Sequence, residues 1–282
     1  MQIFYDHNSL QSFIKSQRER NATIGFAPTM GALHDGHLSL YAKARQENDI
    51  VVASIFINPT QFDNVKDLQK YPRNFDKDIQ ILENSSLVDA VYIPSDKDIY
   101  PEVMERKKYD FGGIEKEMEG EFREGHFDGV GTVVEKLFLQ VQPNTAYFGE
   151  KDYQQLAIVE QLVEIRDLPV KIIGVPIFRE KNGLAMSSRN VRLSETQRES
   201  AKIIYETLLM IEEWFRVITI PEIIERVSKI FEDEEGMVLE YFKIADEKTL
   251  KETDFFYKDK NYRAFIVVFV DDVRLIDNIH LS

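Results

Sequence analysis

The stretch "NATIGFAPTMGALHDGHLSLYAKARQENDIVVASIFIN", residues 21–58, contains two apolar runs of strand length with a helical pattern between them. Residues 21–29 and 49–58 predict strands, and residues 37–48 predict a helix. Because both strands are almost continuously apolar, they are typical of a parallel sheet that is covered on both faces. The stretch therefore predicts a strand-helix-strand unit of an α/β fold.

The same alternation continues along the chain, apart from a stretch at residues 95–129 that predicts mainly loops. Strands that alternate with helices favour a doubly wound, Rossmann-like parallel sheet. The further predicted elements are helix 74–86, strand 88–94, helix 132–142, strand 145–149, helix 153–167 and strand 170–176.

The pattern changes after about Ala185. We therefore expect two domains, a Rossmann-like domain at residues 1–184 and a smaller C-terminal α+β domain at residues 185–282. The elements predicted for the second domain are charged amphipathic helices at 195–215 and 221–233 and short strands at 238–246, 263–270 and 273–279.

The composition is that of a folded chain. Its 282 residues are 43% apolar and include 9 prolines and 13 glycines, which is enough to bury one large core or two smaller ones. No apolar run approaches the roughly 18 residues of a membrane helix, and the N-terminus lacks the features of a secretory signal. We therefore expect a cytoplasmic protein without membrane contact. The absence of cysteine excludes disulfides, thiolate metal sites and a cysteine nucleophile.

The charge balance limits the kinds of partner. Lys and Arg total 35 against 49 Asp and Glu, a net charge of −14, which opposes binding to nucleic acid. A small anionic ligand remains possible, because a local cluster of donors can act close to an acidic surface that salt largely screens.

In a doubly wound sheet, ligands bind beyond the carboxyl ends of the strands. Just after the first strand of residues 21–58, His34 and His37 stand one turn apart, at the start of a helix that we expect to begin near Asp35. A helix N-terminus binds anions, and Gly31 and Gly36 allow a close approach of the backbone. The alternative is that both histidines are capping or surface residues. A zinc site is disfavoured, because the pair lacks the Glu of H-E-x-x-H and a third histidine nearby in sequence.

Further polar stretches follow other strand ends or lie between them. Each alone is consistent with a structural loop, but their gathering at one predicted edge favours a common site. They contain Asn58 and Gln61, then Arg123 and His126, then Gly149, Lys151, Asp152 and Gln155, and finally Met186, Ser187, Ser188 and Arg189.

In these motifs the chain resembles the pantothenate synthetases, the pantoate-beta-alanine ligases of the HIGH-motif nucleotidylyltransferase superfamily. The order of "NPTQF", "GEKDYQQ" and "MSSRN" is more specific than the H-x-G-H pattern, which indicates only the superfamily. The resemblance implies an ATP-binding Rossmann-like domain, a smaller C-terminal lid, a homodimer and dependence on Mg²⁺. The motifs are "PTMGALHDGHLSL", "SIFINPTQF", "YPRNFDKD", "GHFDGVGTVVEKLF", "YFGEKDYQQL" and "GLAMSSRNVRLS", with a weaker echo in "RLIDN".

The implied reaction has two steps. The carboxylate of pantoate attacks the α-phosphate of ATP, giving pantoyl adenylate and pyrophosphate, and the amine of beta-alanine then attacks the acyl carbon and releases AMP. A carboxylate with a pKa of roughly 4 is already ionised at neutral pH, so the first step needs no general base. It needs alignment and neutralisation of phosphate charge, which suits a site made of donors.

The resemblance also implies roles for individual residues. His34, His37, Lys151 and Arg189 would carry the catalysis by bonding the phosphates. Pantoate and beta-alanine would be held by Gln61, Gln155, Asn58 and Arg123. The ATP site would comprise Met30, Gly31, Ala32, Leu33, His34, Asp35, Gly36, His37, Gly149, Glu150, Lys151, Asp152, Phe178, Met186, Ser187, Ser188 and Arg189.

Several points stay open at this stage. Asp76, Asp78 and Asp152 are equal candidates for a ligand of Mg²⁺, and no residue of the motifs is an evident base for the amine of beta-alanine. Asp271 and Asp272 stand where the resemblance leads us to expect a glycine turn. Two rival functions are another nucleotidylyltransferase, which amides such as Gln61 disfavour, and a non-catalytic nucleotide-binding module.

Overall fold

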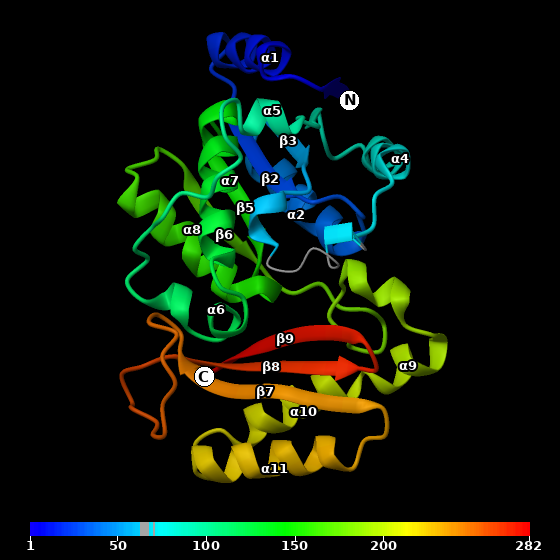
Figure 1. Ribbon diagram of the computed structural model, residues 1–282, viewed down its shortest axis with the longest axis vertical. Coiled ribbons are helices and arrows are strands. Elements are labelled where there is room, and N and C mark those ends of the chain that lie inside the picture. Colours follow the sequence, from blue (N-terminus) through cyan, green and yellow to red (C-terminus); the bar gives the residue numbers. More distant parts are fainter. Residues whose placement is uncertain (63–67, 70) are drawn as a thin grey trace. The chain divides into compact units, whose positions relative to one another are not determined.

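The computed structural model describes residues 1–62, 68–69 and 71–282. The chain forms two compact units (Figure 1). The first unit comprises residues 1–150 and 154–176, and the second comprises residues 151–153 and 177–282. A parallel sheet with helices in the first unit and a small antiparallel sheet in the second confirm the predicted α/β fold class.

The sheet of the first unit is parallel throughout, in the order β1-β4-β3-β2-β5-β6. The chain moves outward from β2 to β3 and then to β4, and returns to β5 on the other side of β2. The strand order therefore reverses between β2 and β5, and such a switch point is where ligands bind in open α/β sheets. The strands are β1 (Gln2–Phe4), β2 (Ile24–Thr29), β3 (Ile50–Ile55), β4 (Ala90–Tyr92), β5 (Thr145–Gly149) and β6 (Lys171–Val175).

Both faces of this sheet are buried, as its apolar strands predict. On one face, Tyr41 of α2 and Leu82 of α4 belong to one core cluster with Ala27 of β2. On the other face, Phe26 packs against Phe138 of α7, with ring centroids 6.3 Å apart. The helices are α1 (His7–Glu19), α2 (Asp35–Glu47), α4 (Phe75–Ser85), α5 (Asp96–Ile99), α6 (Glu119–Phe122), α7 (His126–Val141) and α8 (Tyr153–Ile165), and the short 3₁₀ helices are η1 (Pro59–Gln61), η2 (Ile114–Lys116) and η3 (Glu150–Asp152).

Residues 95–129 are mainly loops, as predicted, but the prediction of a loop around His126 is wrong, because α7 begins there. Gly129 and Gly131 lie inside this helix, and the short helices α5, η2 and α6 also lie in the stretch. Glycine is unfavourable inside a helix, by about 1 kcal/mol relative to alanine. At Gly129, however, a Cβ would lie 2.5 Å from the carbonyl oxygen of Thr60. The glycine lets the helix touch the backbone that follows β3, so it serves tertiary packing.

The second unit contains a three-stranded antiparallel sheet in the order β7-β8-β9, with α10 and α11 packed against it (Figure 1). The single helix predicted at residues 195–215 is wrong, because the chain bends at Ala201 and Lys202 and forms α9 and α10. None of the described helices is long and apolar enough to span a bilayer. The elements are η4 (Ser188–Arg192), α9 (Glu195–Ser200), α10 (Ile203–Trp214), α11 (Ile220–Glu232), β7 (Met237–Asp246), β8 (Tyr262–Val270) and β9 (Val273–Leu281).

The two aspartates at the β8–β9 turn keep a tight hairpin in place of the expected glycine turn. Asp271 has a φ of 49°, a left-handed conformation that Asp tolerates better than most residues. Asp272 forms an ion pair with Arg192 of η4 at 2.6 Å. The turn therefore ties the hairpin to the segment that contains the "MSSRN" motif.

Candidate active site

The loop between β2 and α2 lies at the switch point and is anchored by a buried carboxylate. Asp78 of α4 accepts hydrogen bonds from the backbone amides of Ala32 at 2.9 Å and Leu33 at 2.8 Å. A Cβ on Gly31 would lie 2.8 Å from Asp78 Oδ2, and Gly31 has a φ of 81°. Both oxygens of Asp78 are thus engaged with the loop, so this aspartate positions the loop backbone.

His34 and His37 lie together at the start of α2. His34 is the N-cap residue, and its backbone amide donates to Nδ1 of His37 at 3.3 Å. The ring centroids are 4.0 Å apart. An acceptor Nδ1 leaves the proton of a neutral imidazole on Nε2, where it can be donated to a ligand. The capping interpretation is therefore compatible with a phosphate-binding role for His37, because the two roles use different ring nitrogens.

Asn58 and Gln61, which follow β3, form a buried amide pair. Asn58 Nδ2 donates to Gln61 Oε1 at 3.2 Å and to the carbonyl of Gly129 at 3.1 Å. Gln61 Nε2 contacts the sulfur of Met30 at 3.1 Å. Because Met30 belongs to the loop after β2, the structure brings the predicted residues of two strand ends into direct contact.

Arg123 and His126 also reach this region. His126 is buried, and its Nδ1 lies 2.7 Å from the carbonyl oxygen of Gln61. Arg123 Nη1 lies 3.4 Å from Nε2 of His126 and 3.8 Å from Oε2 of Glu119. Helix α7 thus connects the predicted Arg123 to the loop of Gln61.

Tyr100 is a member of this cluster that the sequence did not suggest. Its hydroxyl donates to Asn58 Oδ1 at 2.7 Å and lies 3.0 Å from Oγ1 of Thr60. Its position just after α5, in a stretch without a motif, gives no local signal of this contact. Only the packing of α5 and α7 around the sheet reveals it.

The end of β5 contributes Gly149, Glu150 and two neighbouring glutamines that differ in their surroundings. Gln154 is buried and donates to the carbonyls of Ile114 at 2.8 Å and Glu117 at 2.6 Å. Gln155, which the resemblance assigns to the substrate, is half-buried on the adjacent position of α8. Of the two amides, Gln154 therefore has a structural role, and the substrate-binding role of Gln155 stays a prediction.

Lys151 and Asp152 belong to the second unit, where the "RLIDN" motif holds their backbone. Asn278 Nδ2 donates to the carbonyl of Lys151 at 2.9 Å, and Arg263 Nη1 donates to Asn278 Oδ1 at 2.6 Å. The Lys151 ammonium lies 3.7 Å from Asp152 Oδ1. The "RLIDN" motif therefore has a structural role, because its Asn278 holds the segment that contains Lys151.

The "MSSRN" loop of the second unit is built by local hydrogen bonds. Ser187 is the N-cap of η4, and its Oγ accepts from the backbone amide of Arg189 at 3.2 Å. The amide of Met186 donates to the carbonyl of Phe178 at 2.9 Å. Ser188 is the first residue of η4. The predicted residues Phe178 and 186–189 thus form one short loop.

A buried ion pair supports the segment that precedes this loop, where Arg179 forms an isolated β-bridge with Ala185. Arg179 donates to both oxygens of Asp277, at 2.6 and 3.0 Å. Burial raises the pKa of Asp277, and the Arg179 guanidinium opposes that rise. Removing one partner of such a buried pair is strongly destabilising, because the other charge is left uncompensated. The pair therefore fixes the base of the loop to β9.

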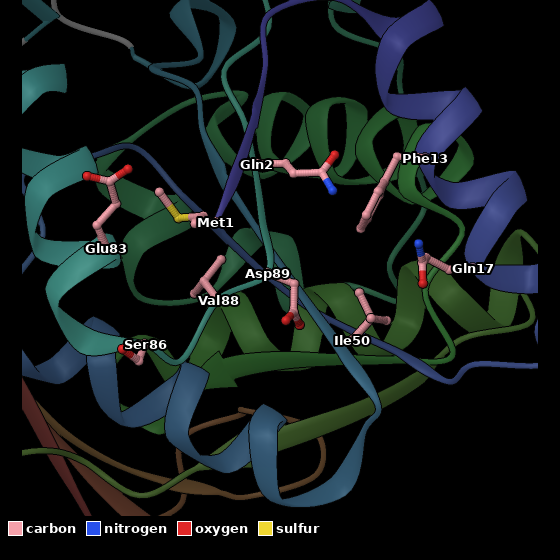
Figure 2. Close-up of a pocket in the computed structure, with 9 residues that line it drawn as sticks. All are labelled: Met1, Gln2, Phe13, Gln17, Ile50, Glu83, Ser86, Val88 and Asp89. Atoms are coloured by element: carbon pink, nitrogen blue, oxygen red, sulfur yellow. The ribbon is translucent and has the colours of Figure 1, made fainter.

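A pocket of about 480 Å³ lies in the first unit, away from the carboxyl ends of the strands (Figure 2). Its carboxylate Asp89 accepts from the backbone amide of Val51 at 2.7 Å and pairs with Arg45. Because it borders the amino ends of β1 and β3, it is separate from the candidate site. Its lining residues are Met1, Gln2, Phe13, Gln17, Ile50, Glu83, Ser86, Val88 and Asp89.

The fold and its switch point define a class of protein, the Rossmann-like α/β proteins, whose ligands bind beyond the carboxyl ends of the strands. The sequence model of the family described as pantoate-beta-alanine ligase matches residues 2–280. The chain belongs to this family, which confirms the resemblance drawn from its motifs.

Relatives and solved structures agree along the whole chain. A pantothenate synthetase of Christiangramia forsetii is 48% identical over 282 residues, with all of both chains covered, and one of Aquifex aeolicus is 46% identical, with 98% and 97% covered. The crystal structure of pantothenate synthetase from Thermus thermophilus is similar with a TM-score of 0.90 at 37% identity, covering 99% of each chain. A pantoate-beta-alanine ligase from Francisella tularensis, complexed with beta-gamma ATP and beta-alanine, has a TM-score of 0.82 at 39% identity, covering 99% of this chain and 97% of that one.

Proposed function

We propose that this enzyme condenses pantoate with beta-alanine to pantothenate, using ATP and forming a pantoyl adenylate with release of AMP and pyrophosphate. The observation that carries the proposal is the match to the ligase family over residues 2–280. The first unit supports it with a helix N-terminus and a histidine pair at the start of α2, and with the buried amides of Asn58 and Gln61, of which Gln61 contacts Met30 in the loop before α2. Such a set offers donors to phosphate on one side and selective hydrogen bonds to a small hydroxy acid on the other.

In the first step the ionised carboxylate of pantoate attacks the α-phosphate, and the enzyme stabilises the charge that develops on the phosphate oxygens. His37 donates from Nε2, and His34 stands beside it at the N-terminus of α2. Lys151 and Arg189 of the second unit supply cationic donors. Removing one such donor typically lowers kcat by about 10²–10³-fold.

Pantoate is held by Gln61 and Gln155, with Asn58 and Arg123 at the same end of the site. In the second step the neutral amine of beta-alanine attacks the acyl carbon and AMP leaves.

The remaining predicted residues line ATP. They are Met30, Gly31, Ala32, Leu33, His34, Asp35, Gly36, His37, Gly149, Glu150, Lys151, Asp152, Phe178, Met186, Ser187, Ser188 and Arg189.

The donor set also fits Mg²⁺ bound mainly through the phosphates of ATP. Within residues 1–62, 68–69 and 71–282, no three His, Asp or Glu side chains cluster in a way that could hold a metal. Mg²⁺ in nucleotide enzymes commonly uses only one or two carboxylates beside the phosphates. Asp76 and Asp152 are exposed and remain candidates, whereas Asp78 is buried and bonded to the loop. When bound, the ion neutralises phosphate charge.

We further propose that residues 1–184 bind ATP and pantoate, that residues 185–282 act as a lid, and that the protein works as a cytoplasmic homodimer. The family resemblance supports these proposals. Light scattering of the purified protein should give twice the mass of one chain. A mass equal to one chain at micromolar concentration would contradict the dimer.

Exchange of labelled pyrophosphate into ATP tests the proposed function. Exchange should depend on pantoate and should not require beta-alanine, and pantothenate should form only when all three substrates are present. Exchange without pantoate would favour another nucleotidylyltransferase. ATP binding without any exchange would favour a non-catalytic nucleotide-binding module.

A further inference from the structure

A buried chain of hydrogen bonds links Tyr100 to Gln61 through Asn58. Tyr100 donates to Asn58 Oδ1 at 2.7 Å, and Asn58 Nδ2 donates to Gln61 Oε1 at 3.2 Å. Asn58 is 1% exposed and Gln61 is 8% exposed. Buried polar groups of this kind adopt one arrangement, because an alternative would leave donors and acceptors unmatched at a cost of about 1–3 kcal/mol each.

The partners fix which way the Asn58 amide points. On one side stands the carbonyl of Gly129, 3.1 Å away, which can only accept, so the nitrogen of Asn58 must face it. On the other side stand the hydroxyls of Tyr100 and Thr60, at 2.7 and 3.1 Å from Oδ1, which can donate. Turning the amide over would place its NH₂ against two hydroxyls and its oxygen against a carbonyl.

Burial keeps the Tyr100 hydroxyl in its protonated form. Burial raises the pKa of Tyr100, and its bond with Thr60 opposes that rise only in part. The hydroxyl therefore remains a hydrogen-bond donor at neutral and mildly alkaline pH.

The fixed Asn58 amide sets the polarity of Gln61 in turn. Because Asn58 donates to Gln61, the Gln61 oxygen must face Asn58 and the Gln61 nitrogen must face the other way. That nitrogen lies 3.1 Å from the sulfur of Met30, on the loop proposed to border the ligands. A thioether is a weak acceptor, so an oxygen of a ligand would be a better partner for this NH₂ group.

We propose that Tyr100 and Asn58 are positioning residues that lock Gln61 with its NH₂ group toward the substrate, where it donates to an oxygen of pantoate. This inference rests on the proposed function, since it assigns the polarity of a contact in that site. It explains why a tyrosine 39 positions after Gln61 in the chain is buried against an amide pair. The locked amide requires an acceptor at this point of the substrate.

Substitution of Tyr100 by phenylalanine tests the positioning role, because it removes the hydroxyl and keeps the ring. For Tyr100→Phe we expect the KM for pantoate to rise about 3- to 10-fold, as for loss of one neutral hydrogen bond, with the KM for ATP unchanged. A merely structural role would reduce the active fraction and kcat without separating the two KM values. Tyr92→Phe is the matched control. Tyr92 is buried on β4, and its hydroxyl donates to Gln140 at 3.0 Å, which is not part of the hydrogen-bonded series Tyr100–Asn58–Gln61. Equal pantoate KM values in the two variants would overturn the positioning role.

A second pair of variants tests the polarity of Gln61 independently. Gln61→Met removes the donor without adding charge, and Gln61→Glu keeps an oxygen for Asn58 but faces pantoate with an acceptor. We expect kcat/KM for pantoate to fall about 10-fold in Gln61→Met and at least 10-fold further in Gln61→Glu. Equal or better activity of Gln61→Glu would overturn the assigned polarity.

These outcomes differ from failure of the function itself. If the unmodified enzyme shows no pantoate-dependent pyrophosphate exchange, the proposed function fails, and the inference fails with it. If the unmodified enzyme is active and the variants behave like Tyr92→Phe, only the inference fails.

Discussion

Polar side chains lie at both ends of the strands of the six-stranded sheet, the amino edge and the carboxyl edge, but their roles differ. At the amino edge, Asp49 accepts from the backbone amide and the hydroxyl of Thr23, both at 2.8 Å, and Asp89 accepts from Val51 at 2.7 Å. These carboxylates satisfy the protein's own donors. At the carboxyl edge, Nδ1 of His37 and Oε1 of Gln61 accept hydrogen bonds from within the protein, and the other polar atom of each side chain is a nitrogen that we propose donates to a ligand. We therefore expect ligands to bind at the carboxyl edge, which lies at the switch point of the sheet.

The largest expected effect is at the carboxyl edge. His37→Ala and Lys151→Ala should each lower the rate of pantoate-dependent exchange by about 10²–10³-fold with the fold intact, because each removes a donor to the phosphates. The measurement is initial exchange rate together with circular dichroism. His7→Ala, on α1 in the first unit, is a control that should exchange at the normal rate. Near-normal exchange in both site variants would refute the roles of His37 and Lys151 as donors to the phosphates. The two edges of the sheet would then not differ in their contribution to the reaction.

Asp78 lies at the carboxyl edge but, like Asp49 and Asp89, it satisfies donors of the protein itself. Its two oxygens accept hydrogen bonds from backbone amides of the loop before α2. Asp78→Asn leaves one buried amide of the loop without its acceptor, so unfolding free energy should fall by about 2 kcal/mol and the KM for ATP should rise. Chemical denaturation and steady-state kinetics measure the two effects. For the stability measurement only, Asp76→Asn is the matched control on an exposed position of α4. An Asp78 variant as stable as this control would show that the loop needs no anchor.

At the amino edge the same kind of change should affect stability alone. Asp89→Asn weakens the ion pair with Arg45, a partly exposed pair worth about 1 kcal/mol or less. The KM values for ATP and pantoate should not change, because this edge lies at the opposite end of the strands from the proposed site. A clear rise in either KM would show that the pocket of Figure 2 takes part in the reaction.

The smallest expected effect is the pH dependence contributed by Asp49. Hydrogen bonds from the backbone amide and then the hydroxyl of Thr23 lower the pKa of Asp49 in the folded protein. Its contribution to stability is therefore present above the unfolded value of about 3.9 and is lost as the pH falls through the folded value. The stability difference between the unmodified protein and Asp49→Asn should shrink as the pH falls below about 4, measured by thermal unfolding. A difference that does not change with pH would contradict the assignment.

Most of the fold could be predicted because its signals are local. The buried strands β2, β3 and β5 are short apolar runs, and α2 begins at the predicted Asp35. The start of α7 could not be predicted, because Gly129 looks like a loop residue until the backbone of Thr60 is seen to pack against it. The motifs placed the candidate residues at strand ends, but no local pattern distinguishes the structural Gln154 from Gln155 or indicates Tyr100.

The sequence by itself determined the α/β fold class, the family and the stretches from which the site is drawn, because periodicity and motifs depend on residues close together in the chain. The tertiary structure alone decided that Asp78 anchors a loop, that Asn278 holds the segment of Lys151, and that Tyr100 reaches Asn58. Each of these contacts joins residues more than 40 positions apart, and hydrogen-bond polarity depends on which atoms meet in space.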